Sequence, residues 1–372
     1  MAKATLVVAS LILFLEGANP MTSRRYHRRR LQGLLVAVLL SLAACRPAPP
    51  PAATPEVDTS PAIAADAAPF LGPEAEITAR QTWTILVALK DTYNPETDEH
   101  GDLYQEQVWA GAKAAATDFG VDIELLGNPC HTCVEDQIRN LDARLAQGDI
   151  DGLVIMVTDS VRLARVVEKA VAKGIPVVAM DTPVNTDDLL SFVVFDNVAG
   201  GRVMGEWVVK QLGGRGRVLL LDGALEQQNA LDRKEGFLAG LETGDIEILD
   251  TQTAHWSDTE AATIVTTWLQ THQEIDAIIA ANYAMAQGAY QALRAAGRDD
   301  TVLVTGFDAM PPALAAIANG ELAATIDQTP GRQARLAVQL LIRHLENGET
   351  FPPRLVLPEI PLIDATNIAD YK

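Results

Sequence analysis

The chain has 372 residues, a hydrophobic fraction of 48% and a formal net charge of −20 at pH 7. This length allows two domains of ordinary size, and the hydrophobic fraction excludes a chain that is mostly disordered. The acidic balance argues against nucleic acid and anionic lipid surfaces as partners.

Residues 1–45 have the pattern of a targeting segment. A basic run at 24–30 precedes an apolar run at 31–42, which is too short to span a bilayer, and Cys45 follows two alanines. A cysteine at this place resembles the lipobox of bacterial lipoproteins, in which it is lipidated and becomes the mature N-terminus. The alternative is an ordinary secretory signal peptide with an incidental cysteine. Because Met21 stands directly before the basic run, it is the expected true start, although Met1 stays open.

Removal of residues 1–45 takes away six basic residues and one acidic residue, which leaves 23 against 48 and a net charge of −25. Residues 46–81 are rich in proline and alanine and show no hydrophobic periodicity. Proline at this density favours extended conformations, so we predict a tether. The predicted location is extracytoplasmic, on a bacterial membrane, with contact to lipid only through the anchor.

From Trp83 onward, apolar runs alternate with amphipathic stretches. The predicted strands are 83–89, 121–126, 152–157, 175–180, 192–195, 217–221, 246–251, 277–280, 302–305 and 322–326. The predicted helices are 105–119, 134–147, 161–173, 198–212, 232–242, 259–272, 284–296, 312–319 and 332–347, before a proline-rich terminal segment at 351–361. Alternation of this kind predicts an α/β fold with doubly wound parallel sheets. Because the series occurs twice, we expect two similar lobes with the site between them.

Two of the predicted strands are followed by polar side chains. Asp308 comes shortly after strand 302–305, and Gln328 comes directly after strand 322–326 and Asp327. In an open parallel sheet, ligands bind at the carboxyl ends of the strands. We therefore expect Asp308 and Gln328 to face one shared cleft.

Six segments together resemble a known family, in order and approximate spacing. They are Gly174 to Asp181 (GIPVVAMD), Phe195 to Gly201 (FDNVAGG), Arg233 to Phe237 (RKEGF), Ala281 to Gly288 (ANYAMAQG), Gly306 to Asp308 (GFD) and Leu322 to Gln328 (LAATIDQ). This set is similar to the type I periplasmic binding proteins, most of all their ribose-binding branch. The resemblance covers about residues 82–360.

The resemblance implies two Rossmann-like lobes joined by a hinge with several crossings. The implied N-terminal lobe is 82–195 plus 329–357, and the C-terminal lobe is 196–328 plus 358–372, with hinges near Phe195, Gln328 and Pro358. It further implies a monomeric, non-enzymatic protein without a cofactor. Such a protein binds a small molecule, above all a sugar, and its closed form is recognised by an ABC permease. A receptor that reports to a sensor kinase or chemoreceptor is the alternative.

The family's ligand-binding positions can be carried over one at a time. They fall on Tyr93 and Asn94 in the first loop, Asp181, Phe195, Trp256, Asn282, Asp308 and Gln328. Carboxylates and amides bind sugar hydroxyls strongly, and an aromatic ring packs on the apolar face of a pyranose. A single Asp or Asn at a strand end is often only a helix N-cap, so the convergence of several strand ends carries the prediction.

Several positions depart from the ribose-binding pattern. Thr182 and Leu231 stand where arginines are expected, Phe195 stands where a serine is expected, and the first loop has Glu96 and Thr97 in place of two phenylalanines, with an acidic insertion to about Gln107. Loss of two cations and gain of an aromatic ring make ribose doubtful. We expect a more apolar and more acidic pocket, suited to a less hydroxylated, aromatic-compatible or cationic ligand.

Cys130 and Cys133 form a CxxC motif between a strand and a helix, as in thioredoxin-type redox sites. Export to an oxidising compartment favours a local disulfide over a metal or ligand contact with His131, and over redox catalysis. A CxxC redox enzyme is thus the least favoured function. The motifs of serine hydrolases, phosphate-binding loops and zinc proteases are lacking in the sequence, which supports no reaction.

Overall fold

The structure is a computed structural model that describes residues 64–72, 75–92 and 102–371. The predicted signal peptide, Cys45, the first part of the tether, Tyr93 and Asn94 lie outside these residues. Everything below concerns the compact unit Glu56–Lys372.

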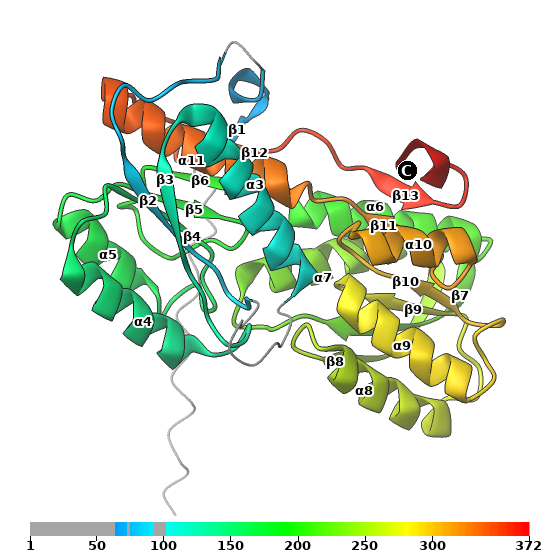
Figure 1. Cartoon of the computed structure of the whole chain (residues 1–372). Coiled ribbons are helices and arrows are strands. Elements are labelled where there is room, and N and C mark those ends of the chain that lie inside the picture. The colour runs from blue at the N-terminus through cyan, green and yellow to red at the C-terminus, as the bar shows by residue number, and fades with distance from the viewer. Residues whose placement is uncertain (1–63, 73–74, 93–101, 372) are drawn as a thin grey trace, which may run out of the picture. The chain divides into compact units, whose positions relative to one another are not determined.

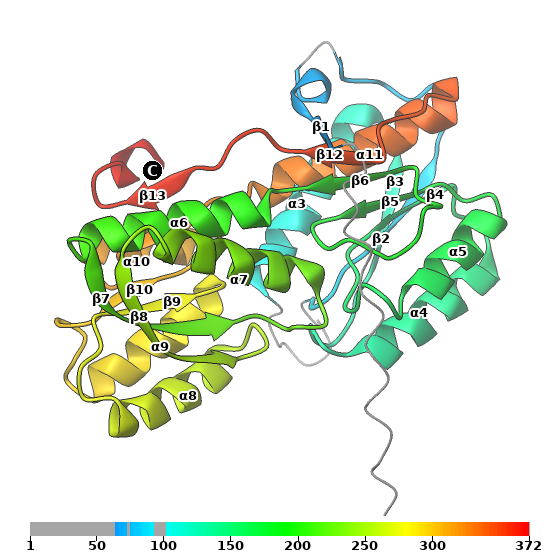
Figure 2. The same ribbon diagram turned by 180° about the vertical axis from the view of Figure 1, so that it is seen from behind.

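The described residues form two sheets (Figures 1 and 2). The first sheet is parallel throughout, in the order β1 (Ala64–Asp66), β12 (Arg354–Val356), β6 (Ser191–Val194), β5 (Val177–Met180), β4 (Gly152–Ile155), β2 (Thr84–Ala88), β3 (Asp122–Leu126). The second has the order β13 (Leu362–Asp364), β11 (Ala324–Ile326), β10 (Leu303–Thr305), β9 (Ala277–Ala280), β7 (Arg215–Asp222), β8 (Asp245–Thr253), with only β13 antiparallel.

Helices cover both faces of the first sheet, because its inner strands are apolar on both sides. Along β2, Ile85 and Val87 pack toward α3 (Leu103–Phe119) and α11 (Pro330–Asn347). The alternate residues Leu86 and Ala88 pack with residues of α4 (Val134–Gln147) and α5 (Ala164–Ala172). We call this sheet with its four helices the first lobe. Short 3-10 helices lie at Ala68–Phe70 and Ile368–Tyr371.

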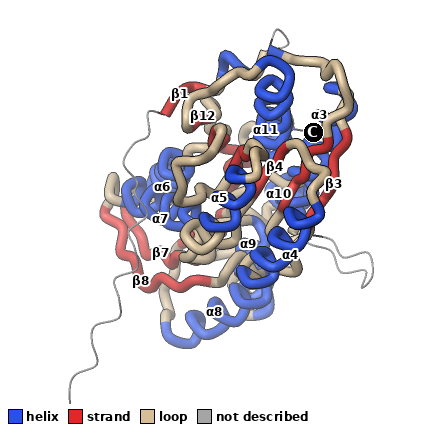
Figure 3. The backbone as a smooth tube through the Cα atoms, turned by 90° about the vertical axis from the view of Figure 1, so that its left-hand side faces the viewer, coloured by secondary structure: helices blue, strands red, loops and turns tan. Residues whose placement is uncertain are grey.

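The second sheet and five further helices form the second lobe. The helices are α6 (Asn197–Gln211), α7 (Gln228–Leu241), α8 (Asp258–Thr271), α9 (Tyr283–Ala295) and α10 (Pro311–Asn319). Figures 1 and 3 show α6 and α7 side by side. Glycines allow this close approach, since a Cβ on Gly236 would lie 2.2 Å from the Val198 carbonyl oxygen. The approach brings Arg233 and Gly236 of α7 against the first turns of α6, next to the candidate site.

The predicted fold class, α/β with doubly wound parallel sheets, is confirmed. The chain passes between the lobes three times: between β6 and α6, between β11 and α11, and between β12 and β13. The predicted tether needs a correction, because Ala64–Asp66 pairs with Arg354–Val356 and Ala67 is fully buried. The terminal segment 351–361, predicted without a strand, contains β12.

Candidate functional site

A small cavity of about 30 Å³ lies where the carboxyl ends of both sheets meet. Its polar side chains come from both lobes. The lining residues are Lys90, Asp102, Tyr104, Gln105, His131, Asp181, Gln227, Asn229, Arg233, Trp256, Asn282, Asp308 and Gln328.

Asp181, directly after β5, is the most highly coordinated carboxylate of this cavity. Its oxygens accept hydrogen bonds from Lys90 Nζ (3.0 Å) and Thr182 Oγ1 (2.7 Å). They also accept from Tyr104 Oη (3.1 Å) and, across the cleft, from Asn229 Nδ2 (3.1 Å). Burial favours the neutral acid, but the Lys90 ammonium and these bonds hold the pKa of Asp181 below its usual range. Asp181 is therefore an ionised carboxylate that is almost completely buried.

Lys90 follows β2 and reaches from the first lobe to the second. Its ammonium donates to Asp181, to Thr182 Oγ1 (2.5 Å) and to Gln227 Oε1 (2.9 Å), and only 2% of the residue is exposed. Burial lowers the pKa of Lys90, and the Asp181 carboxylate opposes that shift. The three partners use all three ammonium protons.

Arg233, on α7, supplies a second buried cation. Its guanidinium lies 4.0 Å from the centroid of the Phe307 ring, donates to Asn197 Oδ1 (2.7 and 3.1 Å) and bonds the carbonyl of Ala281. One nitrogen is 4.0 Å from Asp308 Oδ1. Asn197 and Phe307 thus fix the orientation of Arg233 toward Asp308.

Asp308 is held in an environment that favours its neutral form. Burial raises the pKa of Asp308 to about 7, and the Arg233 charge only partly offsets this effect. Gln328 donates to the same carboxyl group from its place after β11. Asp308 therefore changes charge near neutral pH, unlike Asp181.

Three residues of the cavity have left-handed backbone conformations, which cost energy for residues other than glycine. Asp181, Trp256 and Asp308 have φ angles of 63°, 69° and 68°. Each follows a strand and turns its side chain toward the same cavity. Such strain clusters at functional sites, which favours a binding role for this cavity.

A family model described as a periplasmic binding protein domain matches residues 97–350. This chain belongs to the periplasmic binding protein family. The D-ribose/D-allose-binding protein of Pseudomonas aeruginosa is 32% identical over 64% of this chain and 77% of its own. The ribose import binding protein of Salmonella typhimurium is 34% identical over 62% and 76%. The Caulobacter myo-inositol binding protein, solved with myo-inositol, has a TM-score of 0.70 at 29% identity and covers 79% of this chain and 97% of its own.

Family membership makes this periplasmic binding protein an extracytoplasmic binder of a solute, since the family is one of binding proteins rather than enzymes. Within the described ranges, no group of three or more His, Cys, Asp or Glu side chains is placed to hold a metal ion. None of the described helices combines the length and apolar character needed to cross a bilayer.

The structure brings five of the predicted ligand residues to one cavity: Asp181, Trp256, Asn282, Asp308 and Gln328. The prediction for Phe195 is corrected. Its ring is fully buried in apolar contacts, 6.0 Å from the Phe307 ring, and does not line the cavity.

The expectation of a more apolar pocket is also corrected, although no arginine stands at positions 182 and 231. Leu231 is 39% exposed and lies outside the cavity wall, whereas Lys90 and Arg233 supply two buried charges. Thr182 stands beside Asp181 as a buried hydrogen-bond partner. The site of this binding protein is therefore polar and contains charges of both signs.

Sequence reasoning missed several residues of the cavity. Lys90 directly follows an apolar strand, so the rule that selected Asp181 also applies to it; only its residue type did not fit the expected amides and carboxylates. Arg233 stands in one of the segments that carried the family resemblance. Tyr104, Gln227 and Asn229 reach the cavity through contacts distant in sequence, for which a single sequence holds no signal. His131 was considered only in a less favoured alternative, together with the CxxC motif.

Trp256 depends on a glycine for its place in the wall. A Cβ on Gly223 would lie 2.2 Å from the indole, so Gly223→Ala has to displace the ring. We expect a loss of about 1–3 kcal/mol in the free energy of unfolding, measured by urea denaturation, with weaker ligand binding. Gly331→Ala is the control, because its Cβ would meet only atoms at 3.7 Å. Equal stability of the two variants would contradict this role of Gly223.

Proposed function

We propose that this protein captures a sugar or related polyol outside the cytoplasm and presents it, in the closed form, to an ABC permease. The observation that supports this proposal best is the set of carboxylates and amides that both lobes turn into one cavity. Asn229 Oδ1 and Gln328 Oε1 are buried there and have no hydrogen-bond partner among the described residues. Buried acceptors need donors, which the hydroxyl groups of a polyol supply.

The cavity contains both acidic and basic side chains, which can orient a ligand by accepting and donating hydrogen bonds. Asp181 and Asp308 accept from hydroxyl groups, while Arg233 donates to hydroxyl or ring oxygens. The Trp256 indole supplies the apolar wall on which the C–H face of a sugar ring packs. A neutral ligand with several hydroxyl groups satisfies both kinds of partner.

The three crossings between the lobes are the proposed hinges. Phe195 and Asp196 precede α6, Gln328 and Thr329 precede α11, and Pro358 lies between β12 and β13. Thr329 has a positive φ of 48°, in a short connection that can absorb a change of backbone angles. Closure about these points brings Gln227 and Asn229 against Lys90 and Asp181.

Anchoring belongs to the proposal as well. A lipid on Cys45 and a proline-rich tether hold the monomer at the membrane, near a permease. The support is the order of basic run, apolar run, alanines and cysteine in the sequence.

The direct test is a thermal-shift screen over D-ribose, D-allose, D-arabinose, xylitol and myo-inositol. A ligand that binds only the folded state at a hundredfold excess over its Kd raises the Tm by about 3–6 °C. Asp308→Ala is expected to abolish this shift while it leaves the fold intact. Asp300→Ala, at an exposed turn, is the control and should keep the full shift. No shift with any of these compounds, or an unchanged shift in Asp308→Ala, would contradict the proposed function.

A further inference from the structure

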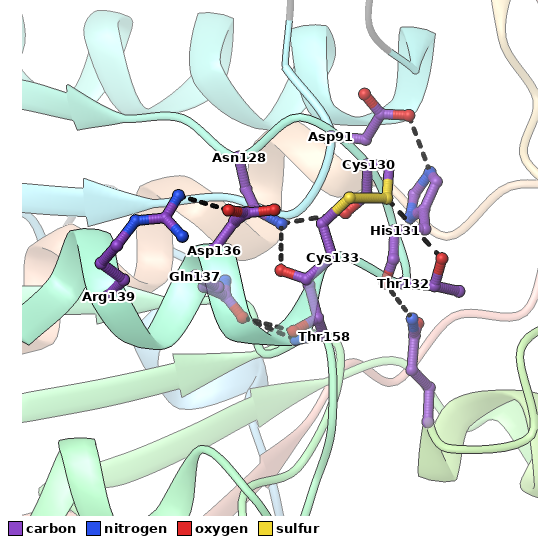
Figure 4. The surroundings of a disulfide bond; sticks show 11 residues. Asp91, Asn128, Cys130, His131, Thr132, Cys133, Asp136, Gln137, Arg139 and Thr158 are labelled. Atoms are coloured by element: carbon purple, nitrogen blue, oxygen red, sulfur yellow. Dashed lines mark hydrogen bonds and ion pairs between the residues drawn. A yellow bond between two sulfur atoms is a disulfide. The ribbon is translucent and has the colours of Figure 1, made fainter.

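The loop that contains Cys130 and Cys133 is fixed to the first lobe at both ends (Figure 4). The two sulfurs form a disulfide, and Asn128 Nδ2 donates to the carbonyls of Cys130 (2.9 Å) and Cys133 (3.2 Å). Pro129 pairs with Asp91 in a short antiparallel bridge. We call residues 130–133 the disulfide loop. Its middle residues are therefore presented in a defined direction.

The backbone of the disulfide loop contacts the second lobe. Gln227 Nε2 donates to the His131 carbonyl at 3.0 Å. Gln227 is fully buried, and its Oε1 accepts from Lys90 Nζ (2.9 Å) and Trp256 Nε1 (3.2 Å). If the His131 carbonyl moves away, a buried amide loses its acceptor. The position of Gln227, and with it Lys90 and Trp256, thus depends on the disulfide loop.

The His131 side chain closes one side of the cavity. Its Nε2 lies 3.4 Å from Asp102 Oδ2 and 3.8 Å from Asp91 Oδ2, and its ring centroid is 6.5 Å from that of Trp256. With the proton on Nε2, toward the carboxylates, Nδ1 is an acceptor. Nδ1 is buried and has no partner among the described residues. It therefore offers a further hydrogen bond to a ligand in this cavity.

Among the described residues, the disulfide loop shares the short segment 226–229, at the start of α7, with other first-lobe partners. Ser160 N donates to the Glu226 carbonyl and Gln228 N donates to Ser160 Oγ, both at 3.3 Å. Lys90 and Asp181 bind Gln227 and Asn229. Of these contacts, the disulfide loop alone contains a disulfide bond. A thiol reagent can therefore disturb this contact selectively, without a mutation.

We propose that the disulfide loop is a cross-lobe contact that favours the closed form, and that His131 is a further ligand-binding residue held in place by the disulfide. Reduction by dithiothreitol transfers two electrons to the sulfur–sulfur bond, which gives two cysteine thiols and the cyclic disulfide of the reagent. The released loop no longer fixes the His131 carbonyl against Gln227. The ligand part rests on the proposed function, whereas the closure part does not.

Hydrogen–deuterium exchange of the full chain without ligand tests the closure part. The amides of Ser160 and Gln228 are hydrogen-bonded across the cleft, so they report lobe opening. Exchange in peptides that contain them is expected to rise about fivefold or more on reduction, and equally in the Cys130→Ser/Cys133→Ser variant. If exchange rises only in the disulfide loop and at the start of α4, the disulfide stabilises local structure alone. This result would overturn the proposal.

Calorimetric titration with D-ribose, D-allose and myo-inositol tests the ligand part. His131→Ala keeps the carbonyl, so exchange at Gln228 should stay unchanged while the Kd rises about tenfold through the lost acceptor. Thr132→Ala, an exposed neighbour in the same loop, is the control with an unchanged Kd. An unchanged Kd in both His131→Ala and the reduced protein overturns the role of His131. If none of the three compounds binds the wild type, the sugar assignment fails, and the exchange result still decides the closure part.

Discussion

Replacement of Asp181 by alanine is expected to lower the free energy of unfolding by about 3–5 kcal/mol, because it leaves the buried Lys90 ammonium without its counter-charge. The ion pair is 3.0 Å long, and each side chain is at most 4% exposed. The part of this loss that comes from the unpaired charge cannot exceed the cost of deprotonating Lys90, because the neutral amine removes the buried charge. Starting from an unperturbed pKa of about 10.4, neutralisation at pH 7 costs about 5 kcal/mol.

A double-mutant cycle separates this charge effect from the lost packing. Lys90→Met in the Asp181→Ala background should recover much of the stability in urea denaturation, because no buried charge then remains. Glu206→Ala is the matched control. Its pair with Arg202 is solvent-exposed on α6, and we expect a change of less than about 0.5 kcal/mol. If the double variant is less stable than Asp181→Ala, the buried Lys90 charge is not the cause.

The sequence predicted the helices and inner strands of both lobes but missed three short strands. Apolar runs and helix caps were enough to predict the inner elements, and the bounds of Val134–Gln147 and Ala277–Ala280 agree with the structure. The strands β1, β12 and β13 were missed because each is a three-residue run near prolines, within or beside the stretches that were interpreted as a tether and a proline-rich terminal segment. These strands are defined by their pairing with neighbours distant in sequence, as where Arg354 of β12 aligns with Phe192 of β6.

The candidate site divides along a similar line. Residues at strand ends, such as Asp181 and Asp308, follow from topology, since parallel strands end at one edge of a sheet. Gln227 and Arg233 approach the cavity from α7, and their partners His131 and Asn197 come from distant elements. Burial of charge is a property of these partners together. No local pattern predicts it, and the expectation of a more apolar pocket was wrong for this reason.

Asp308 is expected to make the stability of the protein depend on pH between about 4 and about 7. Burial raises its pKa in the folded protein to about 7, whereas an unfolded chain has an aspartate pKa of about 3.9. In this interval the folded state holds more protons, so the free energy of unfolding falls as pH rises, by at most about 1.4 kcal/mol per pH unit. Above pH 7 the ionised carboxylate is buried, and this penalty is fully present.

Comparison with Asp308→Asn isolates the effect, because burial also raises the pKa of Asp91, to about 6, and both proteins share that group. By urea denaturation, wild type and variant should differ little near pH 4, and the variant should gain up to about 4 kcal/mol relative to wild type by pH 8. A difference that stays constant over this range would mean that Asp308 titrates as an ordinary surface carboxylate. Hydroxyl groups that donate to Asp308 favour its ionised form, so a saturating sugar should move the transition to lower pH. This shift would show that Asp308, which lowers the stability above pH 7, is also the carboxylate that binds the ligand.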